Sequence, residues 1–233
     1  MGGTAVSCRG LGRRFGRRWA LAHVDLEFAR GESVLLAGAN GSGKTTLLRV
    51  LAGLSTPTRG EVLVHGKDPH VERISARSRI SLVSHASYLY DELTASEMVD
   101  IWERLAGREP SGDRDDLLAE VGLAEHRDQL IGGFSAGMRK RLTLARIHIE
   151  RPDLLLLDEP LAALDADGQG LVERWIRGAI ESGVTVIVAS HAVDRMARLC
   201  ARGLLLEDGQ LVWDGSGAAL PEAMASSNRR SAS

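Results

Sequence analysis

The stretch Gly38-Ala39-Asn40-Gly41-Ser42-Gly43-Lys44-Thr45 constrains the fold of this chain more than any other. It directly follows the apolar run Ser33-Val34-Leu35-Leu36-Ala37 and fits the pattern G-x-x-x-x-G-K-[ST]. The glycines allow a tight turn that points backbone N–H groups at phosphate oxygens, and the N-terminus of the next helix adds a favourable dipole. The sequence therefore predicts a strand over 33–37, a phosphate-binding loop and a helix over 45–52 that Gly53 ends.

Lys44 and the two threonines after it carry the predicted chemistry of this loop. A lysine here can pair with β- and γ-phosphates, the Thr45 hydroxyl can ligate Mg2+, and we expect Thr46 to contact the nucleotide. The chain has only three lysines, Lys44, Lys67 and Lys140, against many arginines, so a compact ammonium at position 44 indicates selection by chemistry. The alternative is a glycine-rich turn that merely precedes a helix.

Length and charge leave the general class of protein open. The 233 residues suffice for one large α/β domain or two small ones, and a net charge of −2 does not steer the chain to nucleic acid or anionic lipid. The pairs Arg13-Arg14 and Arg17-Arg18 are read as a solvated loop face or, alternatively, as an anion contact. Two cysteines are too few for a disulfide framework, which favours a reducing cytosol.

Targeting signals are not visible in the sequence. The first residues lack the apolar stretch of a secretory signal, and the longest pure aliphatic run, 154–157, is far shorter than the ~20 residues of a membrane span. We expect any role at a membrane to depend on a partner.

Hydrophobic periodicity predicts the remaining elements. Residues 24–28 and 61–64 alternate like half-exposed antiparallel strands, whereas 154–157 and 184–189 are nearly continuously apolar like central parallel strands. Helices are predicted over 94–106, 113–121 and 135–150, the first with a capping box from Thr94 to Glu97. On that helix we assign Met98, Ile101, Trp102 and Leu105 to core or subunit packing. An Asp-Gly turn predicts a hairpin over 204–213, and the residues from 216 onward are predicted to be disordered.

A second motif supplies acidic groups. The apolar strand at 154–157 runs into Asp158 and Glu159. At a strand end, Asp158 can hold Mg2+ through water or Thr45, and Glu159 can point at a γ-phosphate and act on the attacking water. The alternative is an acidic turn that ends a buried strand.

Five motifs in one order carry a family resemblance. They are the phosphate loop, Phe134-Ser135-Ala136-Gly137-Met138, Asp158-Glu159, Ala163-Leu164-Asp165 and Ser190-His191. Over about residues 5 to 215 the chain resembles the nucleotide-binding subunit of ABC transporters. The resemblance implies an α/β P-loop NTPase fold: a mostly parallel sheet core, an N-terminal antiparallel β subdomain and an inserted α-helical subdomain at about 86–150. The ATP-binding domain would cover 1–215, with a tail at 216–233.

The resemblance also implies the cofactors ATP and Mg2+ and a role for each motif. Phe15 falls where the family has an aromatic that stacks on adenine, although a lone aromatic is otherwise a core residue. Ser135 and Gly137 would close on the nucleotide held by a second subunit, packed head to tail, and Asp165 would bridge the two subunits. His191 would contact the γ-phosphate and orient Glu159 and water. Without the resemblance, His191 is read as a core histidine.

Two motifs depart from the family pattern. The usual Leu-Ser-Gly-Gly-Gln keeps its serine and second glycine at Ser135 and Gly137 but loses a glycine and the glutamine. The family's Mg2+-contacting glutamine is replaced by His85, which is a poorer Mg2+ partner because this ion prefers oxygen. His85 is therefore assigned either to the metal site or to loop packing.

His85, residues 88–97 and residues 134–141 most resemble the ATP-binding subunit of the haem exporter of cytochrome c maturation, the CcmA family. This resemblance implies a subunit on the cytoplasmic side of the membrane, bound to transmembrane permease subunits and not to nucleic acid. Another small bacterial exporter, for a drug, lipid or polysaccharide, is the alternative. A soluble ABC ATPase acting on DNA or ribosomes is less favoured. Those that act on DNA would need a long coiled coil between the phosphate loop and Ser135, and those that act on ribosomes generally carry two nucleotide domains, whereas this sequence has one such domain and no room for the coiled coil.

Overall fold

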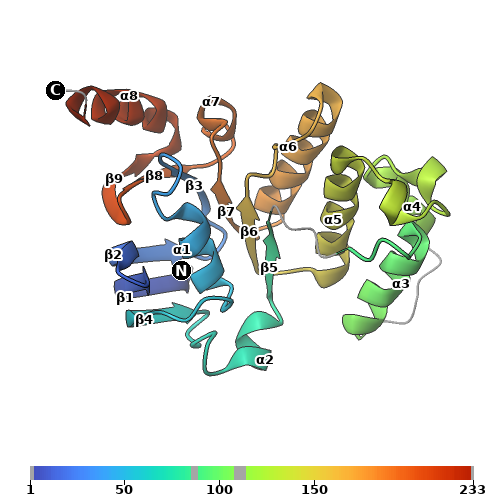
Figure 1. Cartoon of the computed structure of the whole chain (residues 1–233), viewed down its shortest axis with the longest axis horizontal. Helices are drawn as coiled ribbons and strands as arrows, with labels where there is room; N and C mark the ends of the chain where they lie inside the picture. The colour runs from blue at the N-terminus through green and yellow to red at the C-terminus, as the bar shows by residue number, and fades with distance from the viewer. Residues whose placement is uncertain (1–2, 85–88, 108–113, 232–233) are drawn as a thin grey trace.

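The computed structural model describes residues 3–84, 89–107 and 114–231, and these residues form two sheets (Figure 1). The larger sheet has the strand order β5-β6-β7-β3-β8-β9. Its strands are Ile80–Val83 (β5), Leu154–Asp158 (β6), Thr185–Ala189 (β7), Ser33–Ala37 (β3), Arg202–Glu207 (β8) and Gln210–Ser216 (β9). All neighbouring pairs are parallel except β8 and β9, which form the predicted hairpin. The predicted central parallel strands are confirmed.

A smaller antiparallel sheet is formed by N-terminal strands in the order β2-β1-β4. Their bounds are Thr4–Phe15 (β1), Arg18–Ala29 (β2) and Arg59–Val64 (β4). Buried and exposed residues alternate over 24–28, as predicted, because one face of this sheet packs on the core and the other faces solvent. Cys8 of β1 lies opposite Leu26 of β2 and Val62 of β4.

Successive residues of the parallel strands point into two different core clusters. In β6, Leu154 and Leu156 join the cluster formed with α1 (Lys44–Leu51) and the antiparallel sheet. Leu155 and Leu157 join the other cluster, which includes residues of α5 (Ala136–Glu150), α6 (Ala166–Glu181) and α7 (Val193–Met196). In Figure 1, α1 lies between the two sheets. Burial on both faces explains why these strands are continuously apolar.

The described residues between β5 and β6 are mostly helical and lie to one side of the larger sheet, at the right of Figure 1. It contains α3 (Ala95–Leu105), α4 (Arg114–Glu120), η1 (Ala124–His126), η2 (Ile131–Gly133) and α5. The predicted capping box is confirmed: the Thr94 hydroxyl accepts from the Glu97 N–H at 3.2 Å, and Glu97 Oε2 accepts from the Thr94 N–H at 2.8 Å. The prediction that Leu105 packs in the core is wrong within this subunit, because Leu105 is 80% exposed, whereas Met98 and Trp102 are buried as predicted. A short helix, α2 (Arg73–Arg77), precedes β5.

The C-terminal segment corrects a prediction, because the residues after 216 are not disordered over the described range. Gly217–Ala219 forms the short helix η3, and Leu220–Ser231 forms helix α8. Leu220 is completely buried, and Met224 packs against the same core cluster. One buried leucine anchors a helix that hydrophobic periodicity did not reveal. Among the described residues, no helix combines the length and apolar character that crossing a membrane requires.

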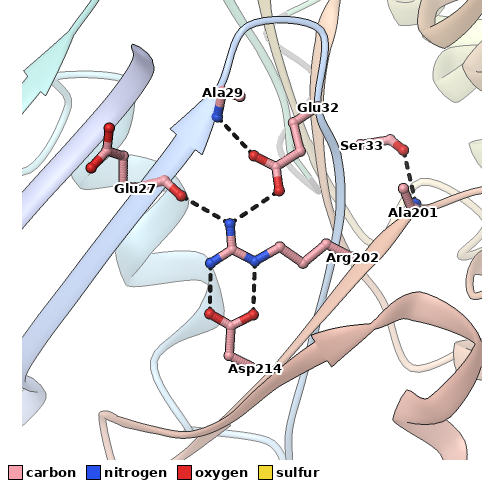
Figure 2. Close-up of polar contacts among 7 residues, drawn as sticks. All are labelled: Glu27, Ala29, Glu32, Ser33, Ala201, Arg202 and Asp214. Atoms are coloured by element: carbon pink, nitrogen blue, oxygen red, sulfur yellow. Dashed lines mark hydrogen bonds and ion pairs between the residues drawn. The ribbon is translucent and has the colours of Figure 1, made fainter.

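Arg202 connects the two sheets, as Figure 2 shows. Its guanidinium donates two hydrogen bonds to Asp214 of β9, at 2.7 and 2.6 Å, and one to Glu32 Oε1 before β3, at 3.0 Å. A further bond reaches the Glu27 carbonyl of β2 at 2.9 Å. The hydrogen bonds to Asp214, and then those to Glu32, raise the pKa of Arg202 above its ordinary value although partial burial opposes them.

Candidate active site

The phosphate loop needs glycine at three positions for its conformation, and at two of them also for space. Gly38, Gly41 and Gly43 have φ of 144°, 80° and 111°, in the region that side chains rarely adopt. A Cβ on Gly38 would lie 2.2 Å from the Leu206 carbonyl oxygen, and one on Gly43 would lie 2.4 Å from the Ala20 carbonyl oxygen. Gly43 precedes α1, whose first turn has no side-chain cap and no acidic residue. Its N–H groups are therefore oriented toward an anion.

Lys44 begins α1 and is 6% exposed. Its ammonium donates to the Gly38 carbonyl at 2.7 Å and the Ala39 carbonyl at 3.0 Å. Burial lowers the pKa of Lys44, and the nearby carboxylates of Glu159 and Asp158 oppose that shift. The loop itself therefore accepts the hydrogen bonds of the cation.

A cleft of about 330 Å3 brings together most of the predicted site residues. It is lined by Phe15, Arg18, Ala20, Asn40, Gly41, Gly43, Lys44, Thr45, Thr46, Asp158, Glu159 and His191. Phe15 is 54% exposed, and the Arg13 guanidinium lies 4.6 Å from its ring centroid. Because the Phe15 ring is exposed beside the phosphate loop, it fits the predicted stacking role better than the alternative of a core residue. Arg18 lines the cleft and so fits the anion-contact reading of the N-terminal arginines.

Three residues of the predicted phosphate loop do not line this cleft, namely Gly38, Ala39 and Ser42. They line an adjoining cavity of about 280 Å3, with Glu207, Asp208 and Met224 among its other residues. The loop is also tied to the β8–β9 turn, because the Gly209 N–H donates to the Ser42 carbonyl at 3.0 Å. This hydrogen bond holds the phosphate loop against the β8–β9 turn.

Asp158 and Glu159 lie at the end of β6, beside the end of β7. Asp158 is 8% exposed, and Glu159 has a φ of 51° with its N–H bonded to the Ala189 carbonyl at 2.8 Å. Glu159 Oε2 accepts from the His191 N–H at 3.2 Å, and the His191 Nε2 lies 3.5 Å from Glu159 Oε1. Within the described residues, Glu159 Oε1 is buried without a hydrogen-bond partner. This oxygen can accept a proton or a hydrogen bond from a bound molecule.

The donors near the loop suit Mg2+. Thr45 supplies a hydroxyl and Asp158 a carboxylate, and both line the cleft. No cluster of three or more histidines, cysteines or acidic residues that could hold a metal forms among the residues described. Mg2+ fits such a sparse set, because it keeps several waters and uses one or two carboxylates together with substrate phosphates. His85, the third predicted metal residue, lies outside the described residues.

Ser135, Gly137 and Asp165 do not line the cleft of their own subunit. Ser135 is exposed and caps α5, accepting from the Met138 N–H at 3.2 Å, as predicted. A Cβ on Gly137 would lie 3.6 Å from the Ala163 carbonyl oxygen. Asp165 caps α6 by accepting from the Gly168 N–H at 2.8 Å. The contact of these three residues with a second subunit's nucleotide remains a prediction.

Sequence reasoning missed one residue of this region. Lys140 is 8% exposed, and its ammonium donates to the Glu159 carbonyl at 3.2 Å. The rarity of lysine, which indicated the importance of Lys44, applied equally to position 140. No local motif connected it to the carboxylates, because they lie on β6, after the end of α5.

The fold and the cleft together define a P-loop nucleoside triphosphatase. The ABC transporter family model matches residues 21–162, more than half of the chain, and the chain belongs to this family as an ATP-binding ATPase subunit. The ABC transporter ATP-binding protein NatA of Bacillus subtilis (strain 168) is 32% identical over 201 residues, covering 84% of this chain and 82% of that protein. The SkfA peptide export ATP-binding protein SkfE of the same strain is 33% identical over 198 residues, covering 82% and 81%.

Solved structures confirm the predicted fold class. A dimeric ATP-binding cassette in a post-hydrolysis state, bound to ADP and Pi, has a TM-score of 0.82 and 26% identity, covering 91% of this chain and 98% of that one. An ATP-binding subunit of an ABC transporter has a TM-score of 0.84 at 23% identity, covering 95% and 94%, and shows likeness of fold alone.

Proposed function

We propose that this subunit hydrolyses ATP within a head-to-tail dimer and thereby drives transmembrane partners from the cytoplasmic side of the membrane. One observation carries the hydrolytic part: Lys44, Thr45, Asp158, Glu159 and His191 line one cleft, and Glu159 Oε1 is buried without a hydrogen-bond partner among the described residues. Such an oxygen suits a general base, since it can take the proton of an attacking water.

Six residues of the cleft have a proposed role. Lys44 exchanges its loop carbonyls for the β- and γ-phosphates, and the free N–H groups of α1 bind the same charge. Thr45 and Asp158 hold Mg2+, which neutralises phosphate charge when bound. Glu159 takes the proton of water, and His191 orients Glu159 through the contacts at 3.2 and 3.5 Å. Phe15 stacks on the adenine.

The dimer is proposed because Ser135 and Gly137 do not line the cleft of their own subunit. Ser135 caps α5, and its hydroxyl and the free N–H groups at that helix end suit an anion. We propose that each Ser135 surface closes on the nucleotide of the other subunit and that Asp165 lies at this contact. The dimeric cassette with ADP and Pi, at 26% identity, supports a dimer.

The proposal predicts that Glu159→Gln accumulates as an ATP-bound dimer. The change keeps the side chain's shape but removes the base, so ATP binds and is not hydrolysed. The dimer is measured by size-exclusion chromatography with light scattering in ATP and Mg2+. Adding Ser135→Arg removes the dimer but leaves ATP binding to the monomer intact. A Glu159→Gln protein that hydrolyses ATP at the normal rate contradicts the base assignment, and a dimer that survives Ser135→Arg contradicts the head-to-tail contact.

For the cargo, we propose haem export for cytochrome c maturation, supported by the resemblance of residues 88–97 and 134–141 to that subfamily. A second candidate, export of another small molecule or peptide, is favoured by the relatives. They include a daunorubicin resistance protein of Streptomyces coeruleorubidus, 33% identical over 219 residues, and the peptide export protein SkfE. Position 85 also carries this resemblance, and for His85 itself we propose a place in the Mg2+ site, with loop packing as the alternative.

Copurification and gene deletion distinguish the two candidates. The tagged chain is purified from detergent-solubilised membranes, and the copurifying subunits are identified. Haem export predicts that deletion of the gene abolishes haem-stained c-type cytochromes and that the wild-type gene restores them. Normal cytochromes together with copurified permease subunits favour the second candidate. Copurified ribosomes or DNA contradict both candidates and the proposed membrane partners.

A further inference from the structure

Two of the three lysines of the chain are buried beside the same carboxylates. Lys44 and Lys140 are 6% and 8% exposed, whereas the 26 arginines dominate the rest of the cationic residues. Lys44 approaches from α1, and Lys140 approaches from the first turns of α5. Burial of two ammonium groups is unfavourable unless each has compensating partners. Backbone carbonyls are such partners, those of Gly38 and Ala39 for Lys44 and that of Glu159 for Lys140.

The Lys140 contact acts on the backbone of Glu159. Its ammonium donates to the Glu159 carbonyl at 3.2 Å, and the Ala162 N–H donates to the same oxygen at 3.2 Å. Glu159 has a φ of 51°, a conformation that is unfavourable for a side-chain-bearing residue and persists only where its surroundings hold it. The Glu159 N–H is held separately by the Ala189 carbonyl at 2.8 Å. Lys140 therefore holds one side of this residue and β7 holds the other.

Lys140 also contributes charge. Its ammonium lies at the Glu159 backbone, and although burial lowers the pKa of Lys140, the charges of Asp158 and then Glu159 oppose that shift. Lys44 interacts with the same acids but lies in the phosphate loop, where a nucleotide competes for it. Lys140 lines neither the main cleft nor the adjoining cavity. Its charge stays with the carboxylates when nucleotide binds.

We propose that Lys140 is a positioning residue for ATP hydrolysis: it holds Glu159 in its left-handed conformation and limits the affinity of the Mg2+ site at Asp158 for the metal. The inference rests on the proposed roles of Glu159 as base and Asp158 as metal ligand. It goes beyond them by assigning a second buried cation, on the helix that Ser135 caps, to the geometry of the base.

Three substitutions separate the two effects. Lys140→Met removes the hydrogen bond and the charge, Lys140→Gln keeps a donor without charge, and Lys140→Arg keeps the charge. In Lys140→Met we expect kcat to fall roughly 10- to 100-fold, because a small misplacement of the base has effects of that size. The KM for ATP stays within about twofold because Lys44 is unchanged. The half-saturating Mg2+ concentration falls, since a cation beside the carboxylates no longer opposes the metal.

The intermediate variants follow from the same reasoning. Lys140→Gln has a higher kcat than Lys140→Met but the same shift in Mg2+ dependence, and Lys140→Arg restores the wild-type Mg2+ dependence. Lys67→Met is the matched control, since it removes the remaining lysine, which lies outside the site, and leaves both quantities unchanged. In the Glu159→Gln background, Lys140→Met lowers the residual rate no further, because both changes act through one residue.

The outcomes are distinct. Wild-type kcat and Mg2+ dependence in Lys140→Met overturn the proposal, as does a further loss in the Glu159→Gln background. If Lys140→Met fails to fold by thermal unfolding, equal Mg2+ dependence in Lys140→Gln and Lys140→Arg overturns it instead. A Glu159→Gln variant with normal turnover rejects the proposed role of Glu159, whatever the Lys140 variants do.

Discussion

In the phosphate loop, the glycines matter because a side chain would collide with neighbouring backbone, and Lys44 matters because it places a buried charge beside the loop. Gly38 and Gly43 each lie against a carbonyl oxygen of a neighbouring strand, and the glycine conformations allow the loop to curve around its own lysine. Lys44 hydrogen-bonds two carbonyls of that loop. The local pattern around position 44 predicted this loop correctly, because glycine and lysine are required by geometry that a few consecutive residues determine.

Lys44→Ala is predicted to abolish ATP turnover. The change removes the buried ammonium placed beside the loop to neutralise phosphate charge, and loss of one such group lowers kcat roughly 10²- to 10³-fold. The measurement is steady-state ATPase activity together with binding of a fluorescent ATP analogue. Wild-type turnover in this variant rejects the loop as the ATP site, and Lys67→Ala serves as the control that keeps full activity.

Gly43→Ala is predicted to destabilise the protein more than Gly16→Ala. Both glycines have positive φ, at 111° and 56°, so both substitutions introduce backbone strain of about 1 kcal/mol. Only the Gly43 Cβ meets backbone, 2.4 Å from the Ala20 carbonyl, whereas nothing lies within 4 Å of a Cβ on Gly16. Urea unfolding measures the difference in free energy. Equal losses contradict the argument that space, and not only φ, requires glycine at position 43.

Among the helices and strands, sequence motifs predicted those elements that are stabilised by contacts between residues close together in the chain. The capping box at Thr94 marked the start of α3, and the Asp-Gly turn marked the β8–β9 hairpin, where Asp208 and Gly209 both have positive φ. Helix α6 was not predicted, although Asp165 caps it and Val172 and Ile176 recur at helical spacing. Helix α8 depends on tertiary burial of Leu220, which no pattern within its own sequence reveals. Lys140 was missed for the same reason.

Leu220→Ala is predicted to destabilise the native state by about 2–5 kcal/mol, the range for truncating a buried leucine. Leu220 is completely buried and belongs to the core cluster of the larger sheet. The free energy of unfolding is measured with urea, and helical content is followed by circular dichroism. Ser226→Ala, on an exposed position of α8, is the control with little effect. A loss below about 0.5 kcal/mol for Leu220→Ala shows that α8 does not pack as described.

The whole molecule is built on two core clusters that share one sheet, and each contains one cysteine. Cys8 belongs to the cluster between the two sheets, and Cys200 belongs to the cluster on the other face. Burial raises the pKa of each thiol from 9.0 to about 12, with the charge of Asp25 adding to the effect at Cys8. The two thiols therefore report separately on the opening of the two clusters.

Both thiols are predicted to resist alkylation in the folded protein at about pH 8.5, where an ordinary cysteine reacts. Because their folded pKa values are raised, these groups favour folding below pH 9.0, and that contribution is lost as pH rises toward about 12. Mass spectrometry after a pulse of iodoacetamide measures each site, with urea-unfolded protein as the reactive control. Rapid labelling of either native thiol contradicts the burial of its cluster.

The leucines of β6 have a consequence for the alignment of the site. Leu154, Leu155, Leu156 and Leu157 alternate between two apolar clusters, so a slip of one residue exchanges leucine for leucine. The free energy of burying the leucines is nearly the same in these alignments, yet a shift of β6 by one residue moves Asp158 by about 3.3 Å along the strand. Only the strand ends distinguish the alignments: the Asp153 N–H bonds the Arg79 carbonyl at 2.9 Å, and the Glu159 N–H bonds Ala189. The leucines supply cohesion, and the polar ends determine where the carboxylates lie.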